Sequence, residues 1–100
     1  MRLNFLADYA VANRHWDPAS ELDKALDDES WVVRSTAARN PYATSEHIDK
    51  ALSDVVWSVR QAAARNPNAT KANLNKALAD SDDDVRASAR VNPNYTKYYT

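Results

Sequence analysis

The residues best suited to chemistry in this chain are arginines and aspartates that recur at a fixed spacing of 26 residues. Each arginine follows an aspartate by six positions: Asp28 and Arg34, Asp54 and Arg60, Asp80 and Arg86. A row of guanidinium groups is suited to phosphate oxygens. A nearby carboxylate can instead hold each guanidinium, within one unit or between adjacent units. We therefore expect a structural Asp–Arg ladder, with nucleic-acid binding as the alternative.

No other combination of side chains predicts catalysis or a bound cofactor. The absence of cysteine and glycine excludes thiolate metal sites, iron–sulfur ligation and glycine-rich phosphate loops. The acidic run at 80–84 lacks the glycine and the distal glutamate of an EF-hand calcium loop. His15 and His47 occupy non-equivalent positions, without a clear third ligand or a nucleophile beside them. We expect no catalytic residue, no metal and no cofactor.

The arginines and aspartates belong to a 26-residue unit that is written three times. In the middle unit, Ile48, Ala51 and Leu52 have the i, i+3, i+4 spacing of one helical face. A break and an alanine-rich second segment over 55–65 follow, and an Asn-Pro pair closes the unit. Each unit therefore predicts two short helices, which gain their stability from stacking on neighbouring units.

The helices must begin and end without glycine. Thr44 and Ser45 are good N-cap residues for the first helix of the middle unit. A residue before proline is disfavoured in the α conformation, and asparagine tolerates the left-handed conformation that glycine usually supplies. We expect Asn40, Asn66 and Asn92 to end the second helices in this way.

The order Ala-Leu-x-Asp, Val-Arg and Ala-x-Asn-Pro-x-x-Thr resembles the leucine-rich repeat variant (LRV) family and, more distantly, HEAT-type repeats. The stretch from Ala51 to Thr70 is a close match, and the resemblance covers residues 22–96. It implies a right-handed solenoid of alternating short helices, and for solenoids a protein-binding role is the usual expectation. Some members hold an iron–sulfur cluster on N-terminal cysteines, which this chain lacks.

We predict one all-α domain over residues 1–100, a right-handed α-solenoid of short paired helices with possible 3₁₀ character. Its expected parts are an N-terminal half-repeat at 3–18, repeats at 19–44, 45–70 and 71–96, and a C-terminal stub at 97–100. Within the half-repeat, residues 5–14 have the pattern of a second helix alone. There Ala7, Asp8 and Val11 occupy the valine, arginine and alanine positions of the unit.

The candidates for binding a partner are residues that recur without an evident packing need, or lie beside such residues. Trp31 and Trp57 share one repeat position near the beginning of the second helix, where a side chain is commonly half exposed. They either form a contact strip or cover the ends of the alanine-rich helices. Arg39 and Arg65 form a shorter arginine row that the third unit does not continue, and Tyr42 lies near it. We expect a non-enzymatic module, a scaffold, adaptor or inhibitor, that binds a protein partner.

Composition and the chain ends set the remaining expectations. The net charge of −1 gives no overall attraction to nucleic acid or anionic membranes. No apolar run approaches the roughly 20 residues of a membrane span, and no signal peptide is visible. Tyr95, Tyr98 and Tyr99 lie where a further unit would stack, and either cap the end or pair with another copy. We expect a cytoplasmic monomer or a weak end-to-end homodimer.

Overall fold

The computed structural model describes residues 17–99, which form seven α-helices and contain no strand or 3₁₀ segment. The predicted all-α class is therefore confirmed for these residues. Most of the predicted half-repeat, with His15 and Trp16, and the last residue of the stub lie outside the described range. The helices are α2 (Pro18–Leu26), α3 (Trp31–Ala38), α4 (Ser45–Leu52), α5 (Trp57–Ala64), α6 (Lys71–Leu78), α7 (Asp83–Val91) and α8 (Tyr95–Tyr99).

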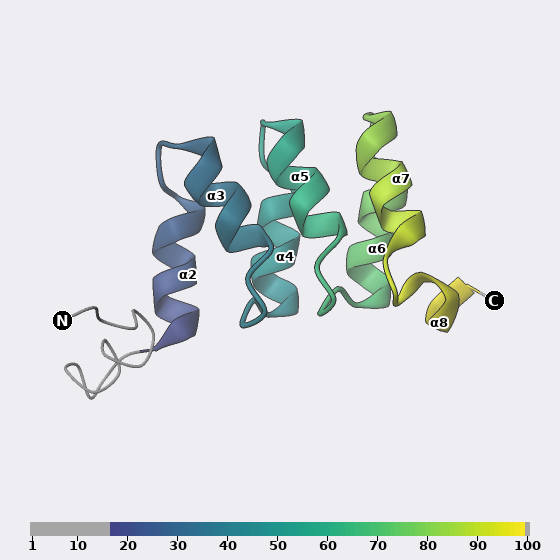
Figure 1. Ribbon diagram of the computed structural model, residues 1–100, viewed down its shortest axis with the longest axis horizontal. Helices are drawn as coiled ribbons and strands as arrows, with labels where there is room; N and C mark the ends of the chain where they lie inside the picture. The colour runs from purple at the N-terminus through teal and green to yellow at the C-terminus, as the bar shows by residue number, and fades with distance from the viewer. Residues whose placement is uncertain (1–16, 100) are drawn as a thin grey trace, which may run out of the picture.

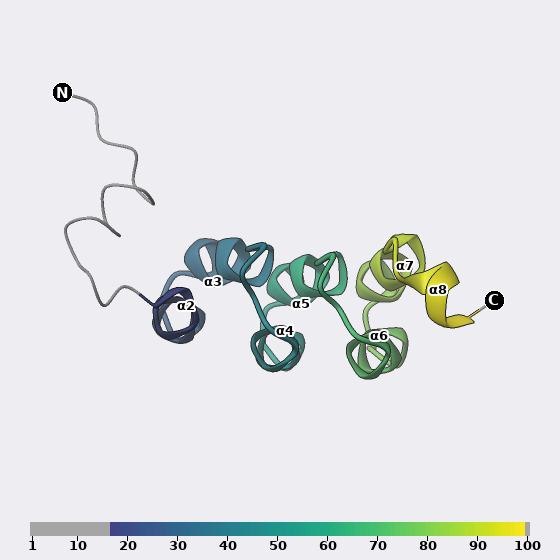
Figure 2. The ribbon, with the colours of Figure 1, turned by 90° about the horizontal axis from the view of Figure 1, so that it is seen from below.

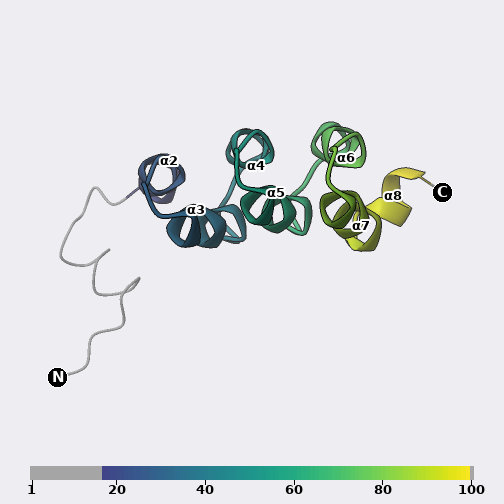
Figure 3. The ribbon, with the colours of Figure 1, turned by 90° about the horizontal axis from the view of Figure 1, so that it is seen from above.

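The helices lie in two rows (Figures 1 and 2). Helices α2, α4 and α6 form one row and α3, α5 and α7 form the other, as Figure 3 shows from the opposite side. Neighbours within a row contact each other, and each first-row helix contacts the second-row helix that follows it. Each 26-residue unit therefore adds one helix to the first row and one helix to the second.

The core lies between the two rows and is built from small or branched residues at equivalent positions. Ile48 and Leu74 of the first row and Val59 and Val85 of the second are fully buried. Ala63 is also fully buried, because an alanine-rich helix leaves room for its neighbour's backbone to approach. Each helix is too short to be stable alone, so burial against neighbours holds the array together.

Two of the first-row helices, α4 and α6, begin with a threonine cap, and at α4 this is Thr44, one of the two expected cap residues. Thr44 Oγ1 accepts the N–H of His47 at 3.3 Å, and Nδ1 of His47 accepts the N–H of Thr44 at 3.0 Å. Thr70 and Asn73 form the same reciprocal capping box in the next unit. Each box satisfies two backbone N–H groups that the helix itself leaves unpaired.

The second-row helix of the middle unit begins two residues later than predicted. Val56 is its N-cap, and the helix runs from Trp57 to Ala64. The carboxylate of Asp54 accepts the N–H of Val56 at 2.9 Å, which bends the chain before the helix starts. Val55 is left 90% exposed in this turn. The predicted start at residue 55 is therefore wrong.

The prediction that asparagines end the helices in the left-handed conformation is also wrong. Within the described residues no φ angle is positive. Asn66 and Asn92 are instead buried, 1% and 4% exposed. The Nδ2 of Asn66 donates to the carbonyls of Ala38 at 2.8 Å and Asn40 at 3.1 Å, both in the preceding unit. These asparagines join one unit to the next, because their amides satisfy carbonyls at the end of the preceding helix.

His47 makes a similar join between first-row helices. Its Nε2 lies 3.1 Å from the carbonyl oxygen of Ala19 and 3.0 Å from a carboxylate oxygen of Asp23. In the next unit, Nδ2 of Asn73 donates to the carbonyl of Ser45 at 3.1 Å. His47 and Asn73 thus each accept the N–H of the capping threonine with one atom and donate to a carbonyl of the preceding first-row helix with another.

We expect His47→Asn to change the free energy of unfolding by less than about 1 kcal/mol, since asparagine serves at the equivalent position. His47→Ala should lower it by about 1–3 kcal/mol, because buried polar groups lose their partner. Urea denaturation followed by circular dichroism measures both values. Equal losses in the two variants would contradict this role of the side chain.

The C-terminal tyrosines cover the end of the array. Tyr95 and Tyr99 stack with ring centroids 4.9 Å apart. Tyr98 and Tyr99 pack against the core, and the Tyr99 hydroxyl donates to Asn75 of α6. These contacts agree with capping of the end, whereas end-to-end pairing stays a prediction.

Candidate partner-binding face

The Asp–Arg ladder runs between units. Arg34 donates to both carboxylate oxygens of Asp54, from Nε at 2.7 Å and from Nη2 at 3.2 Å. Arg60 binds Asp80 in the same way, at 2.8 and 3.3 Å. The remaining guanidinium nitrogen of Arg60, Nη1, donates to the backbone carbonyl of Asp54 within its own unit, at 2.9 Å. Each arginine therefore ties the helix break of its own unit to the next one.

The two ends of the ladder differ from its middle. Asp28 has no guanidinium on its carboxylate among the described residues, and accepts the N–H of Ser30 at 2.8 Å. Arg86 pairs with Asp83 and donates to the carbonyl of Asp80 at 2.7 Å. The ladder thus has an open acidic end at Asp28.

The ladder also sets the electrostatics of its carboxylates. Burial alone would raise the pKa of Asp54, but hydrogen bonds from Arg34 and from the N–H of Val56 outweigh it, and the net pKa is lowered. Burial likewise opposes ionisation of Asp80, yet Arg60 and the N–H of Asp82 hold its pKa below the ordinary value. For Arg34, the hydrogen bond to Asp54 outweighs desolvation and raises the pKa of the guanidinium.

The acidic run at 80–84 supplies one carboxylate of the ladder and the cap of α7. Asp80 holds Arg60, and Asp82 caps α7 by accepting the N–H groups of Asp84 at 2.8 Å and Val85 at 3.1 Å. In the part of the chain that the structure describes, no group of three or more His, Cys, Asp or Glu side chains could hold a metal ion.

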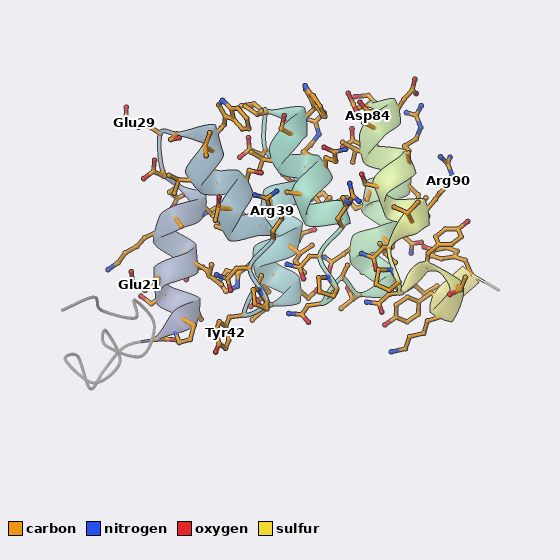
Figure 4. The ribbon with its side chains drawn as sticks, viewed as in Figure 1. Glu21, Glu29, Arg39, Tyr42, Asp84 and Arg90 are labelled. Atoms are coloured by element: carbon orange, nitrogen blue, oxygen red, sulfur yellow. The ribbon has the colours of Figure 1, made fainter. Side chains whose placement is uncertain are left out.

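The second-row helices carry a groove that brings together three of the predicted partner-binding residues. Trp31, Arg39 and Arg65 line this groove, whose volume is about 510 Å³. Figure 4 shows Arg39 between α3 and α5. Trp31 is 49% exposed and Trp57 44%, as their position at the helix start led us to expect.

Helices α3 and α5 each present one stripe to this face. Trp31, Ser35 and Arg39 lie four residues apart on α3 and at its end, and Trp57, Gln61 and Arg65 do the same on α5. Residues four apart share one side of a helix. The groove is lined by Ser35, Ser58 and Gln61 as well, which the sequence reasoning did not single out. The eight-residue spacing from each tryptophan to its arginine is two helical steps of four, and it would have indicated Ser35 and Gln61 midway.

The guanidinium groups of Arg39 and Arg65 differ from those of the ladder. Both side chains are exposed, and within residues 17–99 neither forms an ion pair. Arg34 and Arg60 are, in contrast, only 14% and 16% exposed and are bound to carboxylates. The face therefore offers two unpaired cations beside two half-exposed indole rings.

Tyr42 does not belong to this face. It lines a different groove, with Pro18 and Leu22 of α2, and Figure 4 shows it beside the N-terminal end of that helix. The predicted partner-binding set is thus divided, because the turn after α3 carries the chain away from the groove.

Comparison with known proteins provides no relative from which a function could be inferred. No family model, no curated protein and no solved structure matches the chain. Among the described helices, none is long and apolar enough to cross a membrane.

Proposed function

We propose that this protein is a non-enzymatic interaction module that binds an extended acidic segment of a partner protein across α3 and α5. In this proposal the chain is a right-handed α-solenoid of three repeats, similar to LRV and HEAT-type proteins, and acts as a scaffold, adaptor or inhibitor. The observation that carries the proposal is the pair of parallel stripes, each with an exposed tryptophan at one end and an unpaired arginine at the other.

The chemistry of the stripes favours an acidic partner. Guanidinium forks bind carboxylates through two parallel hydrogen bonds. The half-exposed rings of Trp31 and Trp57 supply apolar area, and tryptophan and arginine are enriched among residues that dominate binding energy. Ser35 lies between the tryptophan and the arginine of one stripe, and Gln61 holds the same place in the other. Both side chains can hydrogen-bond to a peptide backbone. An extended segment would meet one stripe per unit, as is typical of helical repeats.

Nucleic-acid binding remains the alternative, since Arg39 and Arg65 could also meet phosphates. The ladder gives it less support than the sequence suggested, because Arg34 and Arg60 are bound to carboxylates. Few unpaired cations predict weak binding that is sensitive to salt.

We expect the double variant Trp31→Ala/Trp57→Ala, and separately Arg39→Ala/Arg65→Ala, to weaken partner binding by about tenfold or more. Immobilised wild-type protein captures the partner from a native lysate, and mass spectrometry identifies it. The purified partner is then titrated against each variant, with circular dichroism as the folding check.

Val55→Ala is the matched control, because it removes an exposed apolar side chain outside the groove. Unchanged affinity in both double variants would contradict the assigned face. A mobility shift of a DNA or RNA duplex at low salt that depends on Arg39 and Arg65 would favour the alternative.

A further inference from the structure

A second groove lies at the beginning of the two rows, between α2 and α3. It has a volume of about 340 Å³ and a mainly apolar lining that includes Leu22, Ala25, Val32 and Val33. At this end of the array, α2 and α3 have no preceding pair of described helices (Figure 1). Three features at this end of the array, two of them in the groove, show what is missing there when compared with the equivalent positions of the later units.

The first feature is an exposed core valine. Val33 is 39% exposed, whereas Val59 and Val85, which occupy the same position in the next two units, are fully buried. The later valines each have a preceding second-row helix in contact with their own helix. Val33 lacks that cover among the described residues, and leaving an aliphatic side chain in water forfeits its hydrophobic stabilisation.

The second feature is an unused amide donor. Asn66 and Asn92 each donate from Nδ2 to two carbonyls at the end of the preceding second-row helix. Asn40 holds the equivalent position and lines the groove. Its Oδ1 accepts the N–H of Tyr42, but residues 17–99 give its Nδ2 no acceptor. The groove therefore contains a donor placed for the carbonyls of a helix end.

The third feature is the open acidic end of the ladder. Asp54 and Asp80 each accept a guanidinium from the preceding unit, whereas Asp28 has none among the described residues. A preceding second-row helix would thus supply three things: an apolar face, two carbonyls at its end and a cation.

We propose that this groove is the docking site of residues 5–14 of the same chain. This segment has the second-helix pattern, with Ala7 at the position of Val33 and Val11 at the position of Ala37. Ten helical residues span about 15 Å, which is enough to cover α3. The segment also leads directly to Asp17, the N-cap of α2, whose Pro18 lines the groove.

The proposed docking satisfies two of the three features and leaves the third open. Residues 5–14 supply apolar side chains for Val33 and backbone carbonyls for Asn40. At the arginine position, however, the chain carries Asp8, which would lie near Asp28 with the same charge. Docking in the register of the repeats therefore predicts that a cation at position 8 strengthens it.

The test uses the full chain and thermal unfolding followed by circular dichroism. Asp8→Arg should raise Tm by about 3–5 °C, and the gain should disappear when Asp28→Asn is added. Val11→Asp should lower Tm by about 5 °C or more, because it places a charge at a position where the later alanines are buried. Asn13→Asp is the control, since it adds the same charge at the position of exposed Arg39 and Arg65, and should leave Tm unchanged.

Unchanged Tm in both Asp8→Arg and Val11→Asp would overturn the proposal. A gain from Asp8→Arg that survives Asp28→Asn would overturn the register. A gain that increases with protein concentration, with dimers in sedimentation equilibrium, would assign the groove to a second copy and likewise overturn it. None of these outcomes depends on the partner-binding face.

Discussion

Replacing Asn66 with alanine is expected to lower the free energy of unfolding by about 3 kcal/mol. The side chain is 1% exposed, and its Nδ2 donates to the carbonyls of Ala38 and Asn40. Its Oδ1 also accepts the N–H of Asn68 at 2.8 Å. The truncation leaves the buried carbonyl of Ala38 without this donor and removes two further hydrogen bonds that are partly buried. Urea denaturation followed by circular dichroism measures the loss.

Two further variants separate the roles of Asn66. Asn66→Asp keeps an acceptor for the N–H of Asn68 but removes both donors, and turns a carboxylate toward two carbonyls. It should be at least as destabilising as alanine. Asn68→Ala removes a similar pair of bonds, to the carbonyls of Pro41 and Ala43, from an exposed side chain, and should cost about 1 kcal/mol. Full stability of Asn66→Asp would refute the role of Asn66 in joining the units. Its only remaining role would be the local turn in which it accepts the N–H of Asn68.

Breaking the ladder at Asp80 is expected to lower the free energy of unfolding by about 2 kcal/mol at neutral pH. Asp80 is 9% exposed at its side chain, and Asp80→Asn removes the charge that Arg60 faces. In a double-mutant cycle with Arg60→Met, the two losses should not add, because each variant breaks the same pair. Additive losses would show that the two side chains are not coupled.

The same carboxylates make stability depend on pH. The pKa values of Asp54 and Asp80 are lowered in the folded state from an ordinary value of 3.8. The unfolded chain therefore takes up protons first as the pH falls. The ladder's contribution is fully present above the ordinary pKa and is lost as the pH falls through the lowered values.

We expect the free energy of unfolding of the wild-type protein to fall steeply below about pH 4. The double variant Asp54→Asn/Asp80→Asn should show a flatter profile, because the groups responsible are gone. Asp84→Asn removes the same charge from an exposed side chain in the first turn of α7, outside the ladder. This variant should keep the wild-type dependence of the free energy of unfolding on pH. Parallel profiles of the wild-type and double variant would contradict the linkage.

Local patterns predicted the paired helices and the cap of α4, but not the start of α5 or the way the second-row helices end. The i, i+3, i+4 spacing of Ile48, Ala51 and Leu52 predicted α4, because one face of a short helix must be apolar to stack. Thr44 and Ser45 were both recognised as candidate caps from their side-chain chemistry, and the structure has Thr44 as the cap. The half-exposure of Trp31 and Trp57 followed from their place at the helix start. Each inference depends only on residues that are close in the sequence.

The joins between units could not be predicted in the same way. The sequence left open whether Arg34 pairs with Asp28 or with a carboxylate of the adjacent unit, and the fold selects Asp54. It also suggested a conformational role for Asn66, whereas the side chain binds two carbonyls of the preceding unit. A sequence period identifies equivalent residues, but the distance between equivalent residues depends on how far each step displaces and rotates the chain.

The sequence by itself therefore determined an all-helical chain, the period of its units and the side chains available for capping, pairing and exposure. These properties follow from backbone preferences and apolar spacing, which act over a few residues. Only the tertiary structure decided which carboxylate each arginine meets, that Tyr42 lies apart from the tryptophan–arginine stripes, and that Asn40 and Val33 line an open groove. Those outcomes depend on the packing of one helix pair against the next.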